Sequence, residues 1–168
     1  IKFAFTLIKN NYYKKWKFIK MNVIKPVENR PTTVFLAGSI EMNKAENWQD
    51  KVSNYFNDRN VVFYNPLRSD WDSSWEQSAN DDNFAEQVKW EVSHIDSSDI
   101  VYFYIDPTTK SPITLWEIGY TLKTPRRIIM CCPDGYWRRG NLEVYSKIFN
   151  FPFTNNFELS LKWLGERI

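Results

Sequence analysis

Four short runs of apolar residues, separated by segments with helical spacing, constrain the fold of this chain most strongly. The runs cover Thr33–Ala37, Val61–Tyr64, Ile100–Ile105 and Arg127–Cys132, and all four are expected to be buried strands. A strand that is apolar on both faces has to be covered on both faces, which is typical of parallel sheets joined by helical crossovers. The pattern predicts an α/β fold: a three-layer sandwich around a parallel, flavodoxin-like or Rossmann-like sheet of about five strands.

Five segments between and after these runs have the apolar spacing of amphipathic helices. They lie at Asn43–Asn57, Asp81–Ile95, Pro112–Lys123, near Asn141–Phe149 and at about Asn156–Gly165. Because strands and helices alternate, the handedness rule predicts right-handed crossovers between them.

Charge is distributed unevenly along the chain. Residues 1–20 hold six of the 22 basic residues and no acid, so the other 148 residues carry 16 basic and 20 acidic side chains, a net charge of −4. This acidic body argues against nucleic acid as the main partner, and no membrane partner is expected. We expect residues 1–32 to be a basic arm and connector, and residues 33–168 to be one domain. The arm is interpreted as an extension ahead of Met21, with a partner-binding arm or a targeting segment as alternatives.

Cysteine and histidine usage limits the chemistry further. Cys131 and Cys132 are adjacent and provide no disulfide framework, so we expect two small buried side chains in a reducing compartment, the cytoplasm. His94 is the one histidine, which excludes a histidine-based metal site and a Ser-His-Asp triad, and it is expected to be a helix-surface or packing residue. No metal site is predicted.

Glu117 is an acidic residue inside an otherwise apolar helical segment that follows the strand Ile100–Ile105. Ser111 is the expected N-cap of this helix, which puts Glu117 early in the helix on a stripe with Ile113 and Tyr120. In open α/β sheets, ligands bind at the edge where such loops lie. A poorly solvated carboxylate there suits a nucleophile or a proton-transfer group. The alternative is a half-exposed Glu stabilised by the helix dipole.

Glu91 is a second acid on an apolar helix face, which it shares with Phe84, Val88 and Ile95. An unpaired buried charge is costly, so this carboxylate should be either paired or functional. The alternative is a residue at the edge of the stripe that reaches solvent or pairs with Lys89 or Arg127.

Two further features indicate a ligand site. Gly38 and Ser39 end the first strand, where a tight turn lets the backbone approach a ligand, although a plain turn is the alternative. Trp71 and Trp75 lie in a polar loop, where they either anchor the loop or stack on a planar ligand such as a nucleobase. No glycine-rich phosphate-binding pattern is present, which argues against dinucleotide or nucleoside triphosphate binding by those loops.

Four segments together resemble the nucleoside 2-deoxyribosyltransferase-like family: Val34–Met42, Asn65–Trp75, Phe84–Gly119 and Cys132–Val144. The resemblance covers roughly residues 33–165. Its most specific part is SPITLWEIG, residues 111–119, preceded by a strand and by Asp106-Pro107.

The resemblance implies roles for individual residues. Glu117 matches the glutamate that attacks the anomeric carbon of a 2-deoxyribonucleoside, and Glu91 matches an acid that contacts the nucleobase and protonates it as it leaves. Asp106 corresponds loosely to an acid near the sugar or base. The expected substrate-binding residues are Gly38, Ser39, Trp71, Trp75, Ser111 and Asn141.

The implied reaction moves 2-deoxyribose between nucleobases through a covalent intermediate on Glu117, without a metal or an organic cofactor. Attack by water instead of a base would make the protein a hydrolase. The implied partners are small nucleosides and nucleobases. Family members complete the site with residues of a neighbouring subunit, so a homo-oligomer is expected, with Trp137–Asn141 or the C-terminal segment as the contributor.

Two alternatives to the transferase stay open. A 2-deoxynucleoside 5-monophosphate N-hydrolase would need a phosphate site, and its candidate residues are Ser111, Thr114, Arg68, Arg138 and Arg139. Glu41, in the loop after the first strand, weakens that case because it stands where a cation would help. A non-catalytic nucleoside-binding module is the alternative from another class, and its binding would survive the loss of Glu117.

Overall fold

The sheet has five parallel strands in the order β2-β1-β3-β4-β5. The computed structural model describes residues 30–40, 47–67 and 75–168. The strands are β1 (Thr32–Gly38), β2 (Val61–Tyr64), β3 (Ile100–Tyr104), β4 (Ile128–Cys131) and β5 (Phe153–Thr154). This is the flavodoxin-like order, in which the winding direction of the chain reverses between β1 and β3. The predicted fold class is confirmed.

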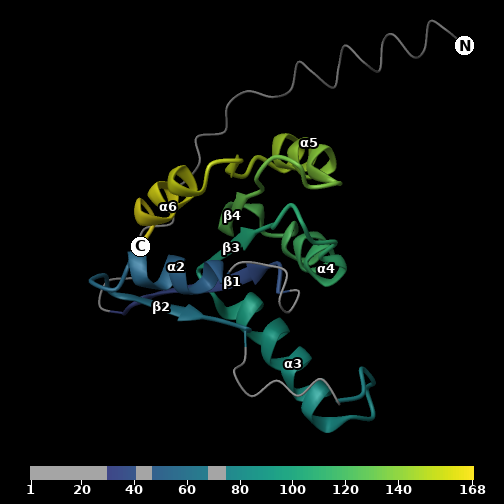
Figure 1. The fold of residues 1–168 in the computed structure, drawn as a ribbon. Coiled ribbons are helices and arrows are strands. Elements are labelled where there is room, and N and C mark those ends of the chain that lie inside the picture. Colours follow the sequence, from purple (N-terminus) through teal and green to yellow (C-terminus); the bar gives the residue numbers. More distant parts are fainter. Residues whose placement is uncertain (1–29, 41–46, 68–74) are drawn as a thin grey trace, which may run out of the picture.

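Helices cover both faces of the sheet, as Figure 1 shows. One face carries α2 (Trp48–Tyr55) and α6 (Phe157–Gly165). The other carries α3 (Asp82–Ser97), α4 (Pro112–Thr121) and α5 (Arg139–Phe149). A short 3-10 turn, η1 (Pro125–Arg127), leads into β4. The three layers explain why the strands are apolar without interruption, since each strand contributes to two cores.

Alternate residues of β1 show this division. Phe35 and Ala37 pack into the core beneath α3, α4 and α5, whereas Val34 and Leu36 pack into the core beneath α2 and α6. All four side chains are at most 1% exposed. Both faces of β1 are therefore fully covered.

Two expectations about the strands need correction. β2 lies at the edge of the sheet with one neighbour, so Val62 is 39% exposed and the strand is only partly buried. The sequence does not show where β5 lies, because two residues are too few to show the period of a strand.

The expected packing roles of cysteine and histidine are confirmed. Cys131 and Cys132 are buried free thiols. The ring of His94 packs against the rings of Trp90 and Tyr64, with centroids 4.1 and 4.3 Å away. Within the described ranges, no helix has the length and apolar character needed to cross a membrane.

Candidate active site

A cavity of about 320 Å³ lies at the carboxyl edge of the sheet, beyond the ends of β1 and β3. Its described lining comes from five places: the end of β1 at Gly38, Pro66 after β2, Gln77 ahead of α3, Glu91 on α3 and the first turns of α4. This is the topological switch point, where open α/β sheets bind their ligands. The described lining includes two acidic side chains, Glu91 and Glu117, and no basic one.

The two acids share this small, poorly solvated space. Burial, and after it the negative charge of Glu91, raises the pKa of Glu117 to about 8. Burial also raises the pKa of Glu91, although a hydrogen bond from Gln87 opposes the shift. Both carboxyl groups are therefore biased toward their protonated forms. A carboxylic acid in such a place can give a proton to a leaving group.

Gln87 holds Glu91 in place. Its Nε2 donates to Glu91 Oε1 over 2.8 Å and to the carbonyl of Pro66 over 3.4 Å. Gln87 is 6% exposed, whereas Val88, expected on this face, is 40% exposed. The i, i+4 spacing of Gln87 and Glu91 could have indicated this contact, whereas the apolar pattern of the helix could not. Glu91 therefore pairs with the amide of Gln87. It does not pair with Lys89 or Arg127, the two cations considered for it.

A cluster of hydroxyl groups fixes the end of β1 to the start of α4. Ser39 Oγ lies 2.8 Å from Thr109 Oγ1 and 2.7 Å from Ser111 Oγ, and it accepts the Asp106 N–H over 2.9 Å. Thr114 Oγ1 donates to the carbonyl of Gly38 over 2.9 Å. These bonds join the two chain segments that meet beneath the cavity.

Ser111 is the N-cap residue of α4, as expected, but its side chain makes no capping hydrogen bond. Its hydroxyl lies 2.7 Å from both Ser39 Oγ and Thr109 Oγ1, and the residue has a φ of 47° in the left-handed region. A non-glycine residue there is held by its surroundings at an energetic cost. The stripe expected for Glu117 is also shifted, because Ile113 is 66% exposed while Thr114, Ile118 and Thr121 form the buried face of α4.

Residues 31–136 match a family described as nucleoside 2-deoxyribosyltransferase like. The chain belongs to this family. The matched range contains every described residue that lines the cavity, from Gly38 to Glu117. No curated protein matches the sequence. A solved structure, a conserved protein from Enterococcus faecalis V583, is similar with a TM-score of 0.47 and 16% identity, over 80% of this chain and 87% of that chain.

In this deoxyribosyltransferase-like chain, Gly38, Ser111, Glu91 and Glu117 line the cavity, and Ser39 lies buried beneath it. Thr114, a candidate for a phosphate site, lines it as well, whereas Asp106 does not. The carboxylate of Asp106 accepts the N–H and hydroxyl of Thr108, over 2.8 and 2.6 Å.

The remaining predicted residues lie away from the described lining or outside the described residues. Trp75 is partly buried outside the cavity, and Asn141 is exposed at the start of α5, so its contribution to a neighbouring subunit stays a prediction. Trp71, Arg68, Glu41 and the arm lie outside the described residues. Arg139 pairs with Asp134 and Glu143, away from the cavity.

Proposed function

We propose that this chain transfers 2-deoxyribose between nucleobases, through a covalent 2-deoxyribosyl intermediate on Glu117. One observation carries the proposal: two partly buried acids, each with a raised pKa, line a single cavity at the switch point of the sheet. Membership of the nucleoside 2-deoxyribosyltransferase-like family supports the same chemistry.

The proposed reaction has two displacements at the anomeric carbon. A nucleobase nitrogen beside Glu91 favours the protonated form of that acid, which leaves Glu117 as the carboxylate. Glu117 then forms a bond to the anomeric carbon while the glycosidic C–N bond breaks, and the departing base takes the proton of Glu91. The carboxylate stabilises the oxocarbenium-like transition state in a medium of low polarity. A second base attacks the same carbon, releases Glu117 and returns a proton to Glu91, so configuration is retained.

The charge of the cavity favours a nucleoside over a nucleoside monophosphate. Glu91 and Glu117 both line it, and carboxylates repel a phosphate group. The hydroxyls of Ser111 and Thr114, candidates for a phosphate site, are already bonded to Ser39, Thr109 and the Gly38 carbonyl. The monophosphate hydrolase is therefore the second candidate.

The test is chromatography of the protein with each 2-deoxynucleoside and a different free base. We expect a new deoxynucleoside from the wild type. We also expect it from Glu158→Gln, the carboxylate-to-amide control matched to Glu117→Gln, which lies at an exposed position on the other side of the sheet. Free base and deoxyribose without exchange would replace the transferase by a hydrolase. Nucleoside binding without any turnover would favour the binding module.

Glu91→Gln tests the proton-donor role separately. An amide cannot protonate the departing base, so exchange from an ordinary deoxynucleoside is expected to slow by about 10²–10⁴-fold. A synthetic deoxynucleoside whose leaving group departs without a proton should be cleaved almost as fast as by the wild type. Equal slowing of both substrates, measured in single-turnover reactions, would mean that Glu91 does not donate the proton.

A further inference from the structure

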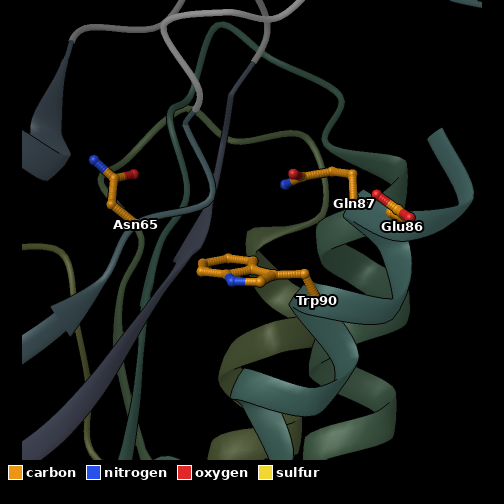
Figure 2. Close-up of a pocket in the computed structure, with 4 residues that line it drawn as sticks. All are labelled: Asn65, Glu86, Gln87 and Trp90. Atoms are coloured by element: carbon orange, nitrogen blue, oxygen red, sulfur yellow. The ribbon is translucent and has the colours of Figure 1, made fainter. Parts of the chain in front are cut away.

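A second cavity of about 320 Å³ lies between α3 and the end of β2. Its described lining consists of Asn65, Glu86, Gln87 and Trp90, and we call it the Trp90 cavity. In Figure 2 the indole of Trp90 lies below the gap between Asn65, which follows β2, and Gln87, which projects from α3. The space therefore has an aromatic floor and polar sides.

The Trp90 cavity and the catalytic cavity adjoin each other. Asn65 lines the first and its neighbour Pro66 lines the second, while Gln87 lines the first and Glu91, one helical turn later, lines the second. The amide of Gln87 donates to both Pro66 and Glu91. Its side chain thus reaches from α3 to the end of β2 and contacts two residues that line the other cavity.

We propose that Gln87 is a specificity-determining residue: it is the wall that limits the size of the nucleobase, and the Trp90 cavity is the space behind that wall. The inference rests on the proposed function, because Glu91, the residue Gln87 contacts, is the acid proposed to meet the base. A substituent that extends past Glu91 meets Gln87 in the wild type. Without that side chain it enters a space whose floor is an indole, which favours a flat aromatic group.

Gln87→Ala should open the wall without disturbing the helix. Alanine has the highest helix propensity, and Gln87 lies inside the 16-residue helix α3. The substitution also removes the hydrogen bond to Glu91, which affects every base that Glu91 protonates. The ratio of two bases therefore isolates the effect of size from the effect on the acid.

The experiment compares adenine with N6-benzyladenine as acceptors of 2-deoxyribose. We expect the ratio of kcat/KM for N6-benzyladenine to that for adenine to rise by at least about tenfold in Gln87→Ala. The rise should be smaller in Gln87→Asn, which keeps the amide on a shorter stem. Lys89→Ala, an exposed change on the same helix that lines neither cavity, should leave the ratio unchanged. An unchanged ratio in Gln87→Ala would overturn the proposal.

A refilling variant tests the identity of the space. Glu86→Phe in the Gln87→Ala background places a ring in the Trp90 cavity and is expected to return the ratio toward the wild-type value. If the ratio stays high, the substituent occupies another space and the proposal is wrong.

Calorimetric binding of both bases separates this inference from the proposed function. If no exchange occurs in the wild type, the transferase proposal fails, but binding still reports on the wall. A gain in N6-benzyladenine affinity relative to adenine in Gln87→Ala, with far-UV circular dichroism unchanged, would support the wall. Equal relative affinity in both proteins would overturn it.

Discussion

Replacing Glu117 by Gln is expected to abolish base exchange while making the protein more stable. An amide does not form the bond to the anomeric carbon, so the rate should fall by at least about 10³-fold. The same change removes a carboxyl group whose ionisation is disfavoured by burial and by the charge of Glu91. Activity and stability should therefore change in opposite directions, as they do where a strained functional group is replaced.

The gain in stability should depend on pH in a defined direction. The pKa of Glu117 is about 8 in the folded chain and near its ordinary value of 4.5 in the unfolded chain. Between these values the folded state keeps a proton that the unfolded state releases, so rising pH destabilises the wild type. Below pH 4.5 both states are protonated and the penalty is absent. Above pH 8 it is complete.

Thermal unfolding of wild type and Glu117→Gln from pH 4.5 to 9 measures this effect. The Tm of the variant should match that of the wild type at the acid end and exceed it by several degrees at the alkaline end. Glu158→Gln, at an exposed position, should show a constant difference across the range. Parallel curves for wild type and Glu117→Gln would contradict the raised pKa of Glu117 in the folded chain.

Gly38→Ala is expected to cost about 3 kcal/mol or more of folding free energy. Gly38 has a φ of 153°, and a Cβ there would lie 2.1 Å from the carbonyl oxygen of Tyr104 and 2.9 Å from the Trp48 ring. The first of these is the backbone of the neighbouring strand, paired with Gly38 in the sheet register, so it has no free rotation to relieve the contact. The end of β1 would have to move away from β3 beneath the cavity.

Chemical denaturation measures the loss, and Gly119→Ala is the matched control. Gly119 lies exposed in α4, and a Cβ there would meet nothing within 4 Å. That change should stabilise the protein by up to about 1 kcal/mol, because alanine favours the helix. Similar effects of the two substitutions would show that the close approach at Gly38 is not what requires glycine.

The layers of the fold were predictable because they follow from apolar patterning alone. A run such as Ile100–Ile105 has no polar face, so it had to lie between two helical layers, and β3 is buried along its whole length. The placement of Glu117 near the carboxyl edge of the sheet followed from the order of strands and helices, whereas Glu91 was assigned to the same site only through the family resemblance. Whether they act as nucleophile and acid remains a prediction for the kinetic tests above.

The errors arose where a residue's surroundings depend on distant parts of the chain. The exposure of Val62 depends on β2 having one neighbouring strand, and the order of the strands cannot be inferred from local hydrophobicity. Gln87 was overlooked because a polar residue on a helix is expected to face solvent, yet the Pro66 carbonyl and Glu91 provide its partners. Ser111 was expected to cap α4 through its side chain because serine is generally preferred there, but its hydroxyl is bonded to Ser39 and Thr109 instead.

The pairing of β1 with β3 also bears on when the cavity forms during folding. Val34 pairs with Ile100 and Gly38 with Tyr104, so these neighbouring strands join parts of the chain that lie far apart in the sequence. Such distant pairings are the slow contacts of folding. The cavity lies beyond the carboxyl ends of these strands, and α4, which contributes to its lining, follows β3 along the chain. We therefore expect a nascent chain to gain this cavity together with the centre of its sheet.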